Sequence, residues 1–446
     1  MRIRRKTTKR EHRWLLGAFC LIWATTPLAL SAQDMRPLSL KESLEAAVKH
    51  ERVVAAQSIA QAAQAEIRIA DRAPAPTLSG SLASIDLEHG VGTGPLFTGK
   101  PLDKGLALDW TWERGEKRSY RTNVSKAQAL ALVAESQEVI KQQQLIVIDL
   151  FYEALSAQER LGILNELAKR AEQLATIAAQ RFGLGDLSAQ DLARLEIEAE
   201  RARVDLIHSQ WLLDRAKQQL RLAIGTDFVE SMVESARGAI NLKGKDETNS
   251  WKVSSDWPKT FALTSVDVEQ IANEQPAVRA AWARLQSAIA QTELARAQDF
   301  SDPSYGVGIN HYPGTSKAIL ALRASIPLYG KNYFEGEKQR AHALRQVAET
   351  QHAEVQRRTR VELHLLFQNR ANAHARLAQF DLEMLPKALK VARQAEEAFA
   401  QGGQTLTDLL EARRTLKSIQ LEALQWRTEF AKAERAWSIG IDRSSP

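Results

Sequence analysis

The histidines and acidic residues are the first candidates for chemistry in this sequence. None of its nine histidines stands three or four residues from another, the spacing that lets one helix offer two ligands to a metal ion. Four follow one another at intervals of ten or twelve: His342, His352, His364 and His374. Phosphate-binding glycine loops and the motifs G-x-S-x-G and H-E-x-x-H do not occur. The sequence therefore predicts neither an enzyme nor a cofactor or metal site.

Asp408 and Glu411 are acidic residues three positions apart, so a helix would place both on one face. Thr405 stands three residues before Asp408, as Ser188 stands three residues before Asp191. A hydroxyl residue followed at this distance by an acid is a variant of the helix capping box. One interpretation is therefore that Asp408 caps a helix and Glu411 is a solvated surface acid.

The turn before each cap contains glycine, which commonly ends a helix in the left-handed conformation. The turn residues are Gly183, Gly185, Ser188, Gly402, Gly403 and Thr405. Each turn follows a very long predicted helix, residues 119–182 and 332–400; the second has Gly336 near its start and Pro386, which predicts a kink. The first would extend roughly 95 Å. Helices this long must pack side by side, as hairpins that end in a tip.

The chain repeats this unit once. Leu222-Ala-Ile-Gly225 returns as Trp437-Ser-Ile-Gly440, and the glycine turn returns at an almost equal offset, which indicates a duplication. Each half has the order helix, strand, strand, long helix, turn, helix, with first helices at 38–72 and 263–300. The expected divisions are a signal peptide (1–31), a first repeat (32–225), a linker (226–262), a second repeat (263–440) and a tail (441–446).

Four segments between the helices alternate in polarity with the period of two that is typical of strands. They lie at about 77–88, 105–114, 303–311 and 318–328, and a bulge near Ala83 would reconcile the two halves of the first. A soluble sheet with one wet face also fits this alternation. Strands of about ten residues match a tilted crossing of a bilayer, and Trp110, Trp112 and Tyr305 stand where an aromatic girdle would lie. Because a barrel needs about eight strands, four per chain require oligomerisation.

Residues 1–31 have the pattern of a secretory signal. A basic stretch precedes the apolar run 14–30, and Ala29 and Ser31 offer a cleavage site. The leader holds seven of the 60 basic and one of the 54 acidic residues, which leaves 53 of each in the mature chain. The basic balance thus belongs to the leader and does not indicate nucleic-acid binding. Cys20, the only cysteine, also lies in the leader. No later stretch approaches the roughly 20 apolar residues of a spanning helix, so any crossing would be made by strands.

Taken together, these features resemble the TolC family of outer-membrane efflux channels, including its heavy-metal cation branch. The resemblance covers about residues 36–225 and 263–440. It rests on Arg181-Phe-Gly-Leu-Gly185-x-x-Ser188-x-x-Asp191, Pro303, Ser325-Ile-Pro327-Leu-Tyr329-Gly330 and Gly402-x-x-Thr405-x-x-Asp408-Leu-Leu-Glu411. It implies a mainly α protein with a small β part: a homotrimer with a helical periplasmic tube and a shared twelve-stranded antiparallel barrel in the outer-membrane lipid. The implied partners are a periplasmic adaptor (membrane fusion) protein and an inner-membrane transporter, of which the RND type is one candidate.

The resemblance also implies roles for residues at the tips. The member that gives the family its name carries two acids three residues apart at the narrowest ring of the tube, and Asp408 and Glu411 match them; three copies would gather six carboxylates and favour cations. The closed state of the family is held by a Tyr and an Arg that contact an acid on the neighbouring hairpin. Asp191 matches that acid, but Phe399 and Gln404 stand at the other two positions. Phe399 cannot donate a hydrogen bond and Gln404 has no charge, so another contact must hold this tip.

The function predicted from the resemblance is a passive exit duct of a tripartite efflux system, which carries small molecules or metal cations across the periplasm and the outer membrane. Energy for transport would come from the inner-membrane partner. Two alternatives stay open: the outer-membrane component of a type I protein secretion system, and a periplasmic coiled-coil adaptor or structural protein without a barrel. The adaptor would need a lipoyl-like β domain between its helices.

Overall fold

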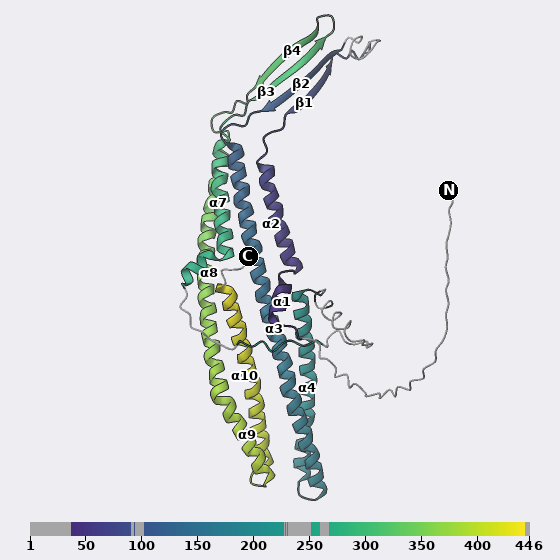
Figure 1. Cartoon of the computed structure of the whole chain (residues 1–446), viewed down its shortest axis with the longest axis vertical. Coiled ribbons are helices and arrows are strands. Elements are labelled where there is room, and N and C mark those ends of the chain that lie inside the picture. Colours follow the sequence, from purple (N-terminus) through teal and green to yellow (C-terminus); the bar gives the residue numbers. More distant parts are fainter. Residues whose placement is uncertain are drawn as a thin grey trace, which may run out of the picture.

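The computed structural model describes residues 37–90, 93, 102–226, 228, 230, 251–258 and 267–441. The predicted leader, most of the linker 226–262 and the tail after residue 441 lie outside these ranges. The described chain is a long rod of helices with a four-stranded sheet at one end (Figure 1). Within the described ranges, no helix is both long and apolar enough to cross a membrane.

The helices follow the predicted order, and the first very long helix is confirmed. The first half contains α1 (Leu40–Ala47), α2 (Glu51–Ala70), α3 (Lys117–Gly183) and α4 (Ala189–Ile224). The second contains α6 (Val268–Glu274), α7 (Pro276–Ala297), α8 (Glu335–Gln379), α9 (Leu385–Ala400) and α10 (Leu406–Ile441). With 67 residues, α3 is about 100 Å long.

The helices predicted at 38–72 and 263–300 are each broken in two, at equivalent places in the two halves. In the first half the chain turns at His50, whose Nδ1 accepts a hydrogen bond from the amide of Arg52 (3.2 Å) and caps α2. In the second half the break precedes Pro276, which has no amide hydrogen and suits the first turn of a helix.

The predicted helix 332–400 is also interrupted. Between α8 and α9 lies a π-helical turn, η2 (Phe380–Met384), in which the amide of Leu385 donates to the carbonyl of Phe380 five residues earlier. Pro386 follows directly. In an α-helix its ring would collide with the carbonyl of Leu382. The irregularity predicted at Pro386 therefore takes the form of a wider turn just before the proline.

The sheet is antiparallel, in the order β1 (Thr77–Ala83), β2 (Asp103–Thr111), β3 (Ser304–Tyr312) and β4 (Ser316–Ser325). The bulge expected near Ala83 is wrong: the register with β2 is unbroken to Ala83, and the strand ends there because Ser84 adopts a φ of 60°. The register shift lies instead in β3, between Asn310 and Tyr312. Trp112 lies one residue beyond β2, and its amide donates to the carbonyl of Pro303 (2.9 Å).

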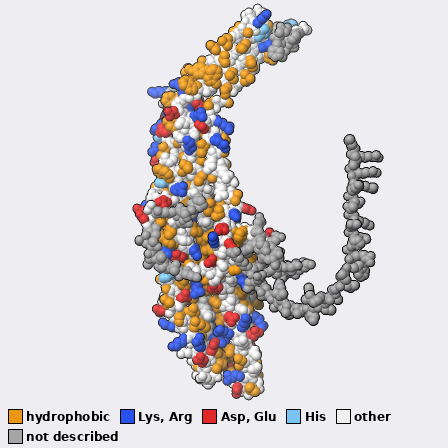
Figure 2. Space-filling model, in the orientation of Figure 1, with side chains coloured by type: hydrophobic (Ala, Val, Ile, Leu, Met, Phe, Trp, Pro, Cys, Tyr) orange, Lys and Arg blue, Asp and Glu red, His pale blue; other side chains and the backbone are white. Residues whose placement is uncertain are grey.

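The strand register separates two faces of the sheet, because residues directly opposite each other share a face. One face is largely apolar and carries Leu78, Leu82, Leu106, Leu108, Trp110, Tyr305, Val307, Ile309, Leu320 and Leu322, with Lys104 and His311 at the end away from the helices. The other is mostly polar or small and carries Thr77, Ser79, Ser81, Asp103, Gly105, Ala107, Asp109, Gly306, Gly308, Asn310, Ile319, Ala321 and Arg323. Figure 2 shows how densely hydrophobic side chains gather over the sheet. Among the described residues of one chain, no other element covers the apolar face, and most of its large side chains are exposed.

The helices form one layer that continues the order of the strands. Next to the sheet, the neighbours run α2, α3, α7, α8; toward the tips they run α4, α3, α10 and then α8 and α9 (Figure 1). The layer therefore has two edges: β1, α2 and α4 on one side, and β4, α8 and α9 on the other.

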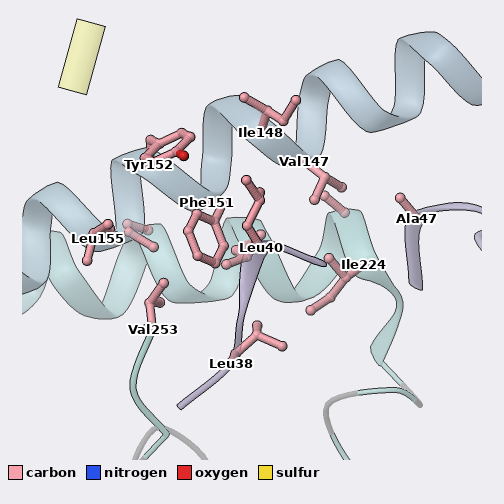
Figure 3. Packing of buried hydrophobic residues seen from close by; sticks show 14 of the residues in the cluster. Leu38, Leu40, Ala47, Val147, Ile148, Phe151, Tyr152, Leu155, Ile224 and Val253 are labelled. Atoms are coloured by element: carbon pink, nitrogen blue, oxygen red, sulfur yellow. The ribbon is translucent and has the colours of Figure 1, made fainter. Parts of the chain in front are cut away.

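The largest apolar core lies halfway along the rod. Leu38, Phe151 and Leu155 are fully buried there, between α1, α3, α4 and the segment 251–258 (Figure 3). Leu38 and Val253 form a parallel bridge, and the hydroxyl of Tyr152 donates to the carbonyl of Asp256 (3.0 Å). Each large buried side chain contributes about 1.5–3 kcal/mol, so residues 251–258 of the predicted linker are anchored in the middle of the rod.

Candidate functional site

The two hairpin tips are built by the same capping chemistry. At the first tip, the amide of Asp191 donates to Ser188 Oγ (3.1 Å), and this hydroxyl donates to Asp191 Oδ2 (2.7 Å). At the second, the amide of Asp408 donates to Thr405 Oγ1 (3.3 Å), and the Thr405 hydroxyl and amide donate to Asp408 Oδ2 (2.8 and 3.2 Å). Such caps satisfy amides that the first helical turn leaves without a partner.

Glycine is needed at one position in each turn. Gly185 has a φ of 82° and Gly402 a φ of 75°, values that other residues adopt only with strain. Gly183 is the last residue of α3, and neither it nor Gly403 has a positive φ. The short turns bring α4 back along α3 and α10 back along α9, which places Asp191 and Asp408 at the far end of the rod from the sheet.

Asp408 and Glu411 differ in what they contact. One carboxylate oxygen of Asp408 is engaged in the cap, although the residue is exposed. Glu411 is exposed as well, and its carboxylate has no hydrogen bond or ion pair with any described residue. The helix cap thus gives the Asp408 carboxylate a structural role, whereas no contact in the described chain gives the Glu411 carboxylate one.

A single chain does not bring Asp191, Phe399 and Gln404 together. The carboxylate of Asp191 contacts Ser188 and Arg194 (3.7 Å), both of its own hairpin. Phe399 packs against an apolar cluster shared by the two tips, formed by Ala178, Leu195, Ala395, Leu406, Leu409 and Leu410. Gln404 is exposed, and its side chain contacts no described partner. In the described chain, Phe399 therefore contributes apolar packing.

Two ion pairs that the sequence reading missed join the hairpins to each other. Arg414 Nη2 of α10 lies 2.8 Å from Glu198 Oε2 of α4, and Lys417 of α10 pairs with Asp205 of α4. The hydrogen bond from Arg414 to Glu198, aided by their charge attraction, raises the pKa of Arg414, which stays protonated. These residues line a groove of about 890 Å³ between the hairpins. Their sequence signal was the spacing of seven between Glu198 and Asp205, which places two acids on one helix face.

The residues predicted to form a membrane girdle lie at the end of the sheet nearest the helices. Trp110 and Tyr305 are directly opposite each other, with ring centroids 6.2 Å apart, and Trp112 is exposed just beyond. Sequence reading missed a second aromatic group after β4. Tyr329, Tyr333 and Phe334 pack with centroids 4.8–5.2 Å apart. These three residues are four positions and then one position apart, and this spacing did not reveal the aromatic group.

The histidines singled out along α8 lie apart from one another. His352 packs against Trp282 and His374 against Phe430, while His364 shares a hydrogen bond with Gln368 (3.0 Å). In the described ranges, no three His, Cys, Asp or Glu side chains gather as a metal centre would.

The comparison with solved structures identifies the fold. CusC matches with a TM-score of 0.73 and 18% identity over 90% of this chain and 91% of CusC. The chain has the TolC-family fold. Two further TolC-type structures agree: the outer-membrane protein VceC from Vibrio cholerae (TM-score 0.71, 18% identity, 90% of this chain and 95% of VceC) and the outer-membrane channel OprN (0.73, 18%, 91% of each chain).

Two curated proteins have related sequences. CyaE from Bordetella pertussis is 26% identical over 221 residues, which are 49% of this chain and 43% of CyaE. The cobalt-zinc-cadmium resistance protein CzcC from Cupriavidus metallidurans is 24% identical over 326 residues, 70% of each chain. The match thus spans less than half of CyaE and most of CzcC. No family model matches this chain.

Proposed function

We propose that the chain is one protomer of a homotrimeric outer-membrane channel, the passive exit duct of an efflux system. The observation that carries this proposal is the single layer of elements with two open edges. In the described sheet β1 and β4 each pair on one side only. A strand edge with unpaired backbone groups is stable in a bilayer only when it closes onto another strand. Pairing β1 of one copy with β4 of the next would close the sheet, and three copies supply twelve strands.

The helices at the two edges support the same closure. The α4 edge exposes Ile207 and Trp211, four residues apart on one helix face, whereas Ile197 and Val204 line the groove between the hairpins. The opposite edge exposes Val361, Leu365, Leu382 and Leu389 from α8, η2 and α9. Because the two edges differ, their contact is head-to-tail, and repetition of such a contact closes a ring when the rotation allows it.

The apolar and polar faces of the sheet then acquire separate roles. The face with Leu78, Leu108 and Leu322 would contact lipid, and the face with Ser79, Asp109 and Arg323 would line the lumen. Trp110 and Tyr305 would lie at the interface nearest the periplasm, where aromatic rings accumulate in membrane proteins. The helices would continue the duct into the periplasm, where an adaptor and an inner-membrane transporter supply the driving force.

Metal cations are the cargo class that we propose. The related protein CzcC is named for cobalt, zinc and cadmium resistance. At the second tip, Glu411 has an exposed carboxylate without a described partner, and Asp408 adds a second charge one turn earlier. Rings of these carboxylates in a trimer would attract cations and repel anions. The cross-hairpin pairs Arg414–Glu198 and Lys417–Asp205 would hold the tips together where the lock of the family is absent.

The channel proposal is tested by conductance of the purified protein in planar bilayers, together with its electrophoretic migration before and after boiling. We expect steady conductance and a trimer that converts to monomer on heating. Trp211→Glu, which puts a charge on the α4 edge, should reduce the trimer, whereas Trp211→Phe should retain it. A monomer without conductance would overturn the proposal.

The role of the tip carboxylates is tested by ion selectivity. Glu411→Gln should lower the preference for cations and weaken block by multivalent cations, because it removes three charges from the aperture without touching the cap. Glu429→Gln, the same change farther up α10, is the matched control and should have a smaller effect. Unchanged selectivity in Glu411→Gln would show that this acid lies away from the constriction.

A further inference from the structure

One charged pair lies on the polar face of the sheet, in a row with a glycine between its members. The row runs Thr77, Asp109, Gly306 and Arg323 across β1 to β4. Arg323 Nη1 and Asp109 Oδ1 are 3.5 Å apart, although a whole strand separates their backbones. The two side chains therefore meet over the backbone of β3.

Gly306 makes this contact possible. A Cβ atom at this position would lie 2.1 Å from Asp109 Oδ1 and 3.4 Å from Cβ of Arg323. The Asp109 carboxylate thus occupies the place where a side chain of β3 would stand. As a result, the pair lies flat against the sheet, with 29% of the Asp109 side chain and 65% of the Arg323 side chain exposed.

The neighbouring rows carry no charge. Toward the far end of the sheet follow the rows Ser79, Ala107, Gly308 and Ala321, and Ser81, Gly105, Asn310 and Ile319. Toward the helices, Thr111 Oγ1 and Ser304 Oγ are hydrogen-bonded (2.9 Å). In these four rows, Asp109 and Arg323 are the charged residues. The electrostatic field at this level of the polar face therefore depends on whether their two charges cancel.

We propose that the Asp109–Arg323 pair sets the charge selectivity of the barrel section of the duct. The inference rests on the proposed function, in which the polar face lines a lumen shared by three chains. Intact, the three pairs form a ring without net charge near the helical end of the barrel. Loss of either partner leaves three like charges in that ring, which would make the section selective for the opposite sign of ion.

The proposal predicts opposite effects for the two members. Arg323→Gln uncovers three aspartates and should raise the K⁺/Cl⁻ permeability ratio, whereas Asp109→Asn uncovers three arginines and should lower it, each by about twofold or more. The double variant and Arg323→Lys should remain close to the unmodified protein, because both keep the ring neutral. A purely structural pair would change assembly in all variants and would not give shifts of opposite sign.

The measurement is the reversal potential of reconstituted channels in a KCl gradient around 0.1 M, where the Debye length is about 10 Å. At 1 M, where it is about 3 Å, the shifts should collapse. If Arg323→Gln does not assemble, Asp109→Asn and the double variant decide the matter. If the variant channels conduct but their K⁺/Cl⁻ permeability ratio does not change, the inference is overturned and the proposed function is not. Absence of conductance in the unmodified protein overturns the proposed function, and the inference with it.

Discussion

Arg370 of α8 and Glu434 of α10 form an ion pair with Nε 2.5 Å from Oε2, and only 5% and 17% of their side chains are exposed. The pair joins two helices, with ring contacts on either side between Phe367 and Trp437 and between His374 and Phe430. A buried pair of this kind positions helices through its directional hydrogen bonds.

Removing one partner of this pair should be strongly destabilising, because the other charge stays buried. For Glu434→Gln we expect a loss of about 3–5 kcal/mol in the free energy of unfolding. The matched control is Glu362→Gln, which breaks the exposed pair Arg358–Glu362 (76% and 54% exposed) and should cost at most about 1 kcal/mol. Urea unfolding followed by circular dichroism measures both. Equal losses would show that burial of the Arg370 pair has no consequence.

The two ion pairs between the hairpins should restrain opening of the tips. Exposed pairs contribute about 0.2–1 kcal/mol each, so losing Arg414–Glu198 and Lys417–Asp205 together should shift the closed-to-open equilibrium by about twofold to thirtyfold. We expect a higher mean conductance for the double variant Arg414→Gln/Lys417→Gln.

The control for the tip variants is Arg203→Gln, which breaks a similarly exposed pair with Glu172 inside the first hairpin. Its conductance should be unchanged, because α3 and α4 stay joined through their turn. An equal rise in both channels would mean that loss of surface charge, and not release of the hairpins, is responsible.

The π turn before Pro386 should tolerate the deletion of one residue. A π turn holds one residue more than an α turn, so deletion of Leu382, whose side chain is 77% exposed, together with Pro386→Ala would convert η2 into continuous α-helix. The faces of α8 and α9 toward α10 would keep their register. We expect this variant to form heat-sensitive trimers like the unmodified protein.

Deletion of Val391 in α9 is the contrasting case. It would rotate the buried residues Ala392 and Ala395 by about 100° relative to Ala388 and separate them from α10. Trimer yield on electrophoresis should fall sharply. If both deletions behave alike, η2 is not the place where the extra residue is absorbed.

Gly306 should resist substitution. In Gly306→Ala the new Cβ would displace the Asp109 carboxylate, a strain of about 1–3 kcal/mol per chain. Gly80→Ala is the matched control, since its Cβ would lie 3.9 Å from the nearest atom, the Gly105 carbonyl oxygen. The temperature at which the trimer dissociates should fall for Gly306→Ala, stay level for Gly80→Ala, and recover when Asp109→Ser is added. No recovery would place the strain elsewhere.

Much of the fold is readable from local patterns. The period of two in the strands, the absence of Pro and near-absence of Gly in residues 119–182, and the hydroxyl-to-acid spacing at Ser188 and Thr405 are short-range signals, and the structure has strands, a helix and caps at those places. The repeated sequence motifs revealed that the two halves have the same order of helices and strands. Element ends were less predictable: β1 stops at Ala83 because of the backbone of Ser84, which no pattern marked.

The candidate site was only partly readable. Asp408 and Glu411 share a helix face by spacing alone, but their different contacts depend on the folded cap. The pairs Arg414–Glu198 and Lys417–Asp205 join residues more than 200 positions apart, and only the packing of both α4 and α10 against α3 aligns them. The pairing of Asp109 with Arg323 likewise needs β3 to lie between their strands with a glycine at the crossing.

The sequence by itself determined the long helices, the strands, the capped tips and the repetition of the unit, because each depends on neighbours within a few residues. It also determined that the chain has no catalytic motif and no paired histidines. The tertiary structure alone decided which charges meet, that the described part of the linker enters the central core, and that the layer ends in two open edges. Those relationships depend on how distant elements pack, and short-range sequence patterns do not encode that packing.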